Sequence, residues 1–427
     1  MTKPETSPHA GPTAASRGQK SLADPAPVDS GVRARLPLDG VRVVEFTHMV
    51  MGPTCGMVLA DLGAEVIKVE PLAGDSTRRL LGSGAGFFTL FNRNKKSLAV
   101  DLHQPEGFEL ILKLIATADV VSENFKPGTM KKLGLDYASL RSLNERLIYV
   151  SHKGFLPGPY DHRTALDEVV QMMGGLAYMT GRPGDPLRAG SSVNDIMGGM
   201  FGAIGAMAAL TVREKTGQGQ EVQSALFENN VFLVAQHMMQ FAVTGEAAAP
   251  MPGRISAWGI YDVFTVKDGE QIFLAVVSDP QWAVFCEVLA FDALRTDQRL
   301  RSNNDRVRAR DWLIPWLRRH LAGHSAAALS AVFEKNGLPF APITRPQDLF
   351  EDPHLNATGG LAPLLLPDGP GGGQSTRVPL LPLTLGGWRP GIRLNPPRVG
   401  EHTQALLAEL GYSEDAIASF QARQITR

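Results

Sequence analysis

The chain has 427 residues, of which 44% are hydrophobic and 20% charged, the composition of a soluble globular protein with material for one or two domains. Its 42 Lys and Arg residues nearly balance 43 Asp and Glu residues, so no global charge recruits nucleic acid or an anionic membrane. Two cysteines, Cys55 and Cys286, exclude a disulfide framework, and no Cys/His cluster has the spacing of a zinc site. We therefore expect a cytoplasmic protein with no metal, no nucleic-acid partner and no membrane partner.

The N-terminal residues 1–35 are rich in Pro, Ala, Ser and Gly and lack the apolar segment of a secretory signal, so we expect a disordered tail. One of the longest uncharged stretches, residues 196–212, is interrupted by four glycines. It falls short of the roughly 20 residues that a membrane-spanning helix needs. We therefore predict that it forms a buried helix.

The segment after the tail alternates strand and helix signals. Residues 41–46 read as a strand, a turn follows at Gly52, residues 55–62 read as a helix, and residues 65–70 read as a second strand. This β-α-β order predicts a parallel sheet that binds ligands near the carboxyl ends of its strands. Further elements are expected downstream, with strands at 97–102, 119–121, 146–151 and 221–223 and helices at 105–117 and 195–214.

The pattern changes near Gly253. Residues 260–277 alternate like an antiparallel hairpin with its turn at Asp268-Gly269. Helices rich in Arg, Leu and Ala follow to about Asn336. These signals predict a second, smaller domain of the α+β type.

The C-terminal region begins with residues 363–397, which are dense in Pro and Gly and predict a long connection before a final helix at 404–410. The expected organisation is a large α/β domain, a small domain, and a linker with a C-terminal return to the large domain, at residues 36–245, 253–345 and 346–427.

A nicotinamide-dependent dehydrogenase is the first functional alternative, because Glu70 ends the second strand where such an enzyme holds a ribose hydroxyl. The turn after the first strand offers Gly52 and Gly56 instead of the Gly-x-Gly-x-x-Gly pattern. The backbone cradle for a pyrophosphate is therefore incomplete, and a structural β-α-β unit is favoured.

Five segments, each weak alone, are specific in their order along the chain: residues 38–46, 61–70, 92–97, 123–128 and 213–220. Together they resemble the class III CoA-transferases, from Leu36 to about Leu410, with the 2-methylacyl-CoA racemases as relatives. The resemblance implies a Rossmann-like large domain, a smaller α+β domain and an interlocked homodimer. It also implies a donor acyl-CoA and an acceptor carboxylic acid as substrates.

The resemblance places the family's nucleophile, an aspartate just before a glycine-rich helix, at Asp195. Its carboxylate would attack a thioester to form an anhydride, and the released CoA thiolate would then form an aspartyl-CoA thioester. Helix amides beside Asp195 would keep it ionised, and Gly198 and Gly199 would leave room for an acyl group. Without the resemblance, Asp195 reads as a helix N-cap.

Asp167 matches a second acidic position near the reacting centre of the family, and its residue-level alternative is a helix-start carboxylate. In the racemase relatives a histidine precedes this aspartate, because moving an α-proton between two faces needs two groups. Here that position is Leu166, which favours a transferase over a racemase. A non-catalytic CoA-binding protein of the same fold is a further alternative, against which Asp195 argues.

CoA carries phosphates and an adenine, so its groove needs cations and flat apolar surface. Taken singly, the lysines of such a groove also read as solvated surface charges and its phenylalanine as core. CoA enters as part of the substrate, and no permanently bound cofactor is expected. By resemblance the binding residues are His48, Met51, Val100, His103, Asn124, Phe125, Lys126 and Lys132.

The acyl group is expected beneath the small-domain segment that holds Ser256, Trp258 and Tyr261. Arg254 nearby would pair with the free carboxylate of a C4 to C5 dicarboxylic acid such as succinate or mesaconate, although an exposed loop arginine reads equally well. Val50 replaces the glutamine of formyl-CoA transferase, whose tetraglycine loop also has no counterpart here. Both departures argue against formate and oxalate.

Overall fold

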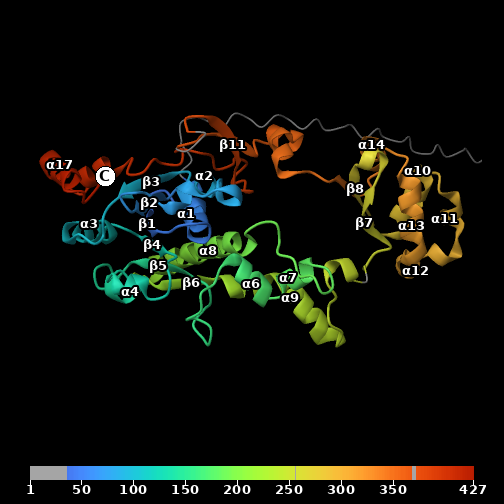
Figure 1. The fold of residues 1–427 in the computed structure, drawn as a ribbon, viewed down its shortest axis with the longest axis horizontal. Coiled ribbons are helices and arrows are strands. Elements are labelled where there is room, and N and C mark those ends of the chain that lie inside the picture. Colours follow the sequence, from blue (N-terminus) through green and yellow to red (C-terminus); the bar gives the residue numbers. More distant parts are fainter. Residues whose placement is uncertain (1–35, 255, 368–371) are drawn as a thin grey trace, which may run out of the picture. The chain divides into compact units, whose positions relative to one another are not determined.

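The computed structural model describes residues 36–254, 256–367 and 372–427. The predicted N-terminal tail lies outside the described residues. The large sheet has six parallel strands in the order β3-β2-β1-β4-β5-β6 (Figure 1). Its strands are β1 Arg42–Phe46, β2 Glu65–Glu70, β3 Lys95–Ala99, β4 Val120–Glu123, β5 Ile148–Lys153 and β6 Glu221–Ala225.

Successive side chains of each strand point to opposite sides of the sheet, so both faces carry apolar side chains. Helices cover both faces. Val43 packs in a cluster with the buried residues of α1 (Met51–Asp61) and α8 (Val193–Thr216). Val44 packs in the other cluster, with α3 (Pro105–Ala116) and the C-terminal helices. The predicted α/β architecture with a parallel sheet is therefore confirmed.

Helix α1 begins at Met51, four residues earlier than predicted. The Gly52-Pro53 pair lies inside its first turn instead of forming a separate turn. Proline is tolerated there because the first amides of a helix have no partner within the helix. The early start brings Met51 into the helix directly after the β1 loop.

Helix α8 is long and apolar enough to cross a membrane by length and composition. It packs against α1, β5 and β6 through Gly198, Gly202 and Ala206. Its other face exposes Met200, Phe201 and Ile204 to solvent in the single chain. The prediction of a buried helix is therefore right for one face and wrong for the other.

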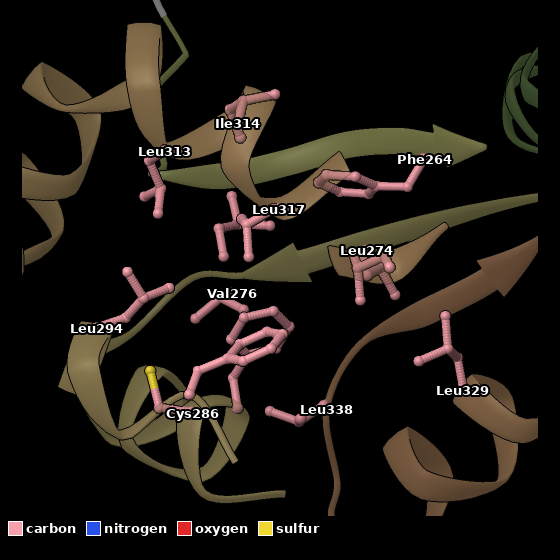
Figure 2. Packing of buried hydrophobic residues seen from close by; sticks show 14 of the residues in the cluster. Phe264, Leu274, Val276, Cys286, Leu294, Leu313, Ile314, Leu317, Leu329 and Leu338 are labelled. Atoms are coloured by element: carbon pink, nitrogen blue, oxygen red, sulfur yellow. The ribbon is translucent and has the colours of Figure 1, made fainter. Parts of the chain in front are cut away.

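A separate antiparallel sheet contains β7 (Ile260–Thr265), β8 (Gln271–Val276) and β9 (Phe340–Pro342). The predicted hairpin is confirmed, and its turn holds Asp268 and Gly269 at φ of 60° and 78°. Figure 2 shows Leu313 and Leu317 of α13 (Arg310–Leu321) beside Phe264, Leu274 and Val276 of this hairpin in one apolar core. Helices α10 (Asp279–Val288) and α14 (Ala326–Lys335) complete that core.

The Pro- and Gly-rich region was wrongly predicted to be a plain connection, because β10 (Leu361–Leu365) and β11 (Ser375–Pro379) pair as an antiparallel hairpin within it. Buried Leu364 and Val378 supply the apolar contacts that hold the pair. The helix predicted at 404–410 is α16 (Thr403–Glu409), but it is not the last, since Ser413 caps a further helix, α17 (Glu414–Ala422).

Further helices connect these elements. Two of them matter below, the short α6 (Asp167–Met173) and the long α9 (Leu226–Thr244). The remaining helices are α2 Phe87–Phe91, α4 Thr129–Lys132, α5 Tyr137–Leu140, α7 Leu176–Thr180, α11 Asp292–Thr296, α12 Asn303–Arg308 and α15 Pro353–Ala357.

Candidate active site

The sheet reverses its strand order between β1 and β4, and ligands of open α/β sheets bind at such a point, beyond the carboxyl ends of the strands. There the backbone amide of His48 donates to Asn124 Oδ1 at 3.0 Å, and Asn124 Nδ2 donates to the His48 carbonyl at 2.8 Å. The His48 ring stacks on Phe125 with centroids 5.6 Å apart. Three of the predicted CoA-binding residues are thus brought together.

Buried side chains fix the loop of residues 47–49, which follows β1 and contains His48. Lys68 is fully buried, donates to the Thr47 carbonyl at 2.6 Å and pairs with Asp75 at 3.0 Å. Asp75 accepts from the Thr77 hydroxyl, which in turn accepts from the Met49 amide at 2.9 Å. Sequence reasoning missed these residues, although a lysine inside an apolar strand was a signal, because a buried lysine requires a partner.

Met49 itself adopts a left-handed backbone, with φ of 64°. A non-glycine residue in that region costs about 1–3 kcal/mol and persists only where its surroundings fix it. That support comes from Lys68, which donates to the Thr47 carbonyl, and from Asn124 and Thr77, which accept from the His48 and Met49 amides. These contacts fix the backbone conformation of the loop.

Asp167 and Asp195 meet at the start of α8. Asp167 Oδ2 accepts from the Asn194 amide at 2.7 Å and from the Asp195 amide at 3.1 Å. The N-cap position is Ser192, and Asp195 is the third residue of the helix. The N-cap interpretation of Asp195 is therefore wrong. Asp167, on another helix, accepts the hydrogen bonds of the free amides at the start of α8.

The environment of Asp195 favours its neutral form. Burial, and secondly the negative charge of Asp167, raise the pKa of Asp195 to about 7. The expectation that the helix amides keep Asp195 ionised is also wrong, since those amides point to Asp167. A carboxylate that titrates near neutral pH is more basic and more nucleophilic when ionised than an ordinary one.

Gly198 and Gly199 do not leave open space. A Cβ at Gly198 would lie 2.4 Å from Met51 Cε, and one at Gly199 would lie 2.4 Å from the Met51 carbonyl and 2.5 Å from Thr54 Cβ. The two glycines instead allow α1 and α8 to approach closely. Their contact holds the start of α8, with Asp195, beside the turn that follows β1.

Of the remaining predicted CoA-binding residues, Met51 begins α1 beside Gly198 and Gly199, and the other four lie elsewhere on the carboxyl edge. Val100 is buried and forms a β-bridge with Thr426, whereas His103 is exposed after β3. Lys126 and Lys132 are exposed beyond β4. The described contacts do not join these four residues to the pair formed by His48 and Asn124.

A pocket of about 280 Å³ opens beyond β4 and β5. Three lysines and three carboxylates line it, namely Lys126, Lys131 and Lys153 with Glu123, Asp136 and Glu221. Lys153 pairs with Glu123 at 2.8 Å. Lys131 and Lys153 escaped sequence reasoning. For Lys153 the available signal was a lysine before a glycine, two residues after the strand predicted at 146–151, whereas Lys131 carried no such signal.

The small-domain segment is held by polar contacts to its neighbours. Asn303 donates to the Ala257 carbonyl at 2.9 Å and accepts from the Gly259 amide at 3.1 Å. Trp258 and Tyr261 contact each other with ring centroids 4.8 Å apart, and Ser256 is buried beside them. Arg254 is exposed and contacts the sulfur of Met251.

Glu70, which suggested a dehydrogenase, uses its carboxylate for contacts within the protein. It pairs with Arg78 at 2.7 Å and accepts from the Ser97 hydroxyl and the Asp75 amide. Among the described residues, no group of three or more His, Cys, Asp or Glu side chains could hold a metal ion.

These features describe an α/β protein in which the partly buried carboxylate of Asp195 lies in the first turn of the core helix α8. The family model of CoA-transferase family III matches residues 38–403, and the chain belongs to this family. It is therefore a class III CoA-transferase, which uses CoA as part of its substrates and acts on an acyl-CoA and a carboxylate.

Two relatives and one solved structure illustrate the similarity. The chain is 35% identical to a succinate–glutarate CoA-transferase of Agrobacterium fabrum, over 88% of this chain and 96% of that one. It is 33% identical to an acetyl-CoA:oxalate CoA-transferase of Acetobacter aceti, over 88% and 97%. A crystal structure of a CAIB/BAIF family protein from Brucella suis has a TM-score of 0.78 at 35% identity, over 88% and 100% of the two chains.

Proposed function

We propose that this CoA-transferase works through a covalent intermediate on Asp195. The carboxylate attacks the donor thioester, which gives an acyl-aspartyl anhydride and free CoA thiolate. The thiolate attacks the aspartyl carbonyl, which gives an aspartyl-CoA thioester and the donor acid. The acceptor acid then attacks this thioester, and the released thiolate attacks the acceptor's carbonyl, so that acyl-CoA forms and Asp195 is regenerated.

The observation that carries this proposal is the desolvated Asp195 beside Asp167, with a pKa near neutrality. A covalent mechanism predicts that oxygen-18 from a labelled acceptor carboxylate exchanges into the Asp195 carboxylate, because the bridging oxygen of the second anhydride stays on the aspartate when the thiolate attacks the acceptor's carbonyl. Asp195→Asn should abolish the exchange. Absence of exchange in a wild-type enzyme that still transfers CoA would overturn the covalent route.

CoA is proposed to bind along the carboxyl edge of the large sheet, with His48, Met51, Asn124 and Phe125 near the reacting end. Its phosphates are proposed to contact the lysines of the pocket beyond β4 and β5, a pocket that Glu123, Asp136 and Glu221 also line. The other residues proposed for CoA contact are Val100, His103 and Lys132. Lys131→Ala and Lys153→Ala should each raise the KM for acyl-CoA more than they lower kcat.

The acceptor is proposed to be a C4 to C5 dicarboxylic acid, such as succinate, glutarate or mesaconate. The relative named for succinate and glutarate supports this class, and Arg254 offers a cation for the distal carboxylate. The relative named for oxalate is nearly as similar, so a panel must include both lengths. Arg254→Ala should weaken succinate and glutarate selectively, and unchanged selectivity would refute the role of Arg254.

A racemase is disfavoured, because the residue before Asp167 is Leu166, whose side chain has no acidic or basic group that could transfer a proton. The test is deuterium incorporation at the α-carbon of 2-methylacyl-CoA. Exchange in the absence of CoA transfer would favour the racemase alternative, and CoA binding without either reaction would favour a non-catalytic binding protein.

The Rossmann-like description and the interlocked homodimer belong to this proposal. The strand order β3-β2-β1-β4-β5-β6 supports the first. Large exposed apolar side chains on α8 and α9 support the second, among them Ile204 at 53%, Phe232 at 66% and Val243 at 80% exposure. Light scattering should give twice the chain mass, and Ile204→Asp should disturb assembly.

The domain limits 36–245, 253–345 and 346–427 and a cytoplasmic location are likewise proposed. A net charge of −1 gives the protein no general attraction for nucleic acid or membranes. Limited proteolysis should cut near residues 246–252 before it cuts the two sheets. Cell fractionation tests the location.

A further inference from the structure

Gln171 lies one turn after Asp167 on α6 and is fully buried. Its Nε2 donates to Asp167 Oδ1, and its Oε1 accepts from the Ala189 amide at 2.8 Å. A primary amide offers both a donor and an acceptor, and Gln171 uses both. It therefore connects α6 with the segment that leads into α8.

Asp167 continues this chain of hydrogen bonds. Its Oδ1 is engaged by Gln171, while its Oδ2 holds the amides of Asn194 and Asp195 at 2.7 and 3.1 Å. Because both oxygens are committed, the carboxylate has a fixed orientation. Each bond in such a chain polarises the next and strengthens it.

A second tether comes from α9. Asn194 Nδ2 donates to Asn230 Oδ1 at 3.0 Å, and both side chains are fully buried. A Cβ at Gly174 would lie 2.0 Å from Asn230 Nδ2, so the end of α6 also packs on this side chain. The first turn of α8 is thus attached to α6 and α9 through amide and carboxylate groups.

We propose that Gln171 is a positioning residue for the CoA-transfer reaction. By locking Asp167 onto the amides of Asn194 and Asp195, it sets the orientation of the first turn of α8 and hence the direction in which the Asp195 carboxylate meets the thioester. Gln171 itself touches no substrate. This inference rests on the proposed role of Asp195.

The expected effect is on the rate of chemistry, because a displacement of about 1 Å at a reacting group costs up to roughly a hundredfold in rate. The residues proposed to bind the reacting end of CoA, His48, Asn124 and Phe125, have no described hydrogen bond with Gln171, whose partners are Asp167 and Ala189. A structural role alone would lower stability and leave kcat of the folded fraction unchanged.

The test compares Gln171→Leu with Asn144→Ala in the full-length protein. Asn144 is a partly buried amide that donates to the Ala118 carbonyl at 2.8 Å, remote in the sequence from the α6–α8 contact, so it controls for loss of an internal amide. Gln171→Leu should lower kcat and the single-turnover rate of adduct formation on Asp195 about a hundredfold, with the KM for succinyl-CoA within about threefold. Asn144→Ala should leave both rates unchanged.

Gln171→Asn provides a second variant if the leucine variant does not fold. It keeps a buried amide but is one methylene shorter, so it cannot reach both Asp167 and Ala189, and it should show the same loss of kcat. Equal adduct rates in wild type and either folded Gln171 variant would overturn the inference. Failure of the wild type to form an adduct would instead refute the covalent role of Asp195.

Discussion

The carboxylate of Asp167 accepts a hydrogen bond from the backbone amide of Asp195 at 3.1 Å, while burial and, secondly, the negative charge of Asp167 raise the pKa of the Asp195 side chain. Asp167 therefore holds the backbone of the proposed nucleophile and adds to the effect of burial on its basicity. The partial positive charge at a helix N-terminus usually stabilises an anion at this position. Here the amides that carry it donate to Asp167 instead of the Asp195 side chain. Asp195 remains protonated to a higher pH than an ordinary surface aspartate.

The rate of adduct formation on Asp195 should rise with pH, with a midpoint near 7. Only the ionised carboxylate attacks, and its pKa is raised from 3.8 to about 7, so the ionised fraction falls about tenfold per pH unit below that midpoint. Asp167→Asn removes the neighbouring charge and should shift the midpoint to lower pH. Pre-steady-state mass spectrometry from pH 5 to 9 measures both, and an unchanged midpoint would contradict the assigned cause.

Substitution of Lys95 by Met should destabilise the fold strongly. Lys95 is fully buried, its pKa is lowered by burial to about 8, and it pairs with buried Glu45 at 2.8 Å. Removal leaves Glu45 without its nearest cation, at a cost of about 3–5 kcal/mol. Lys96→Met is the matched control, because that partly exposed lysine pairs with Glu65 at the surface and is worth at most about 1 kcal/mol.

Urea denaturation of the two lysine variants gives the comparison. Equal losses of unfolding free energy would show that the buried Lys95–Glu45 pair stabilises the fold no more than a surface pair does. A larger loss for Lys95→Met is the expected result.

Gly199→Ala should disturb the packing of α8 on α1. The new methyl group would lie 2.4 Å from a backbone carbonyl, which cannot move aside as a flexible side chain can. Overpacking of this kind costs about 1–3 kcal/mol. Gly323→Ala is the control, since its Cβ meets nothing within 4 Å. Thermal unfolding should separate the two variants, and equal Tm values would argue against a close helix contact.

Asn124→Ala should weaken acyl-CoA binding more than it slows the reaction. It removes two hydrogen bonds to the His48 backbone, each worth about 0.5–1.5 kcal/mol, and frees the loop from the end of β4. The KM for succinyl-CoA should rise about tenfold with kcat within about threefold. A loss confined to kcat would place Asn124 nearer the reacting groups than CoA.

Local sequence patterns predicted most of the large sheet. The Val- and Ile-rich runs of β1 and β2 and the helix between them are visible in the chain, and their parallel register is confirmed. The start of α1 was misplaced because a Gly-Pro pair was read as a turn, although it fits the first helical turn. The β10–β11 hairpin was missed because Pro and Gly conceal the apolar pair Leu364 and Val378.

The site was predictable only where a resemblance named its residues. Asp167 and Asp195 were singled out, but not the bond between them, because it joins positions 28 residues apart on different helices. The buried partners Gln171 and Lys68 follow from tertiary packing. Gln171 carried no local sign, whereas Lys68 interrupts an apolar strand and could have been noticed.

The central claim is that Asp195 becomes covalently attached to CoA. The most direct measurement is to incubate the protein with succinyl-CoA, trap with hydroxylamine, and map the modified peptide by mass spectrometry beside Asp195→Ala. A hydroxamate on Asp195, absent from the variant, is the predicted result. No modification at Asp195, in a wild-type enzyme that transfers CoA under the same conditions, would contradict the account.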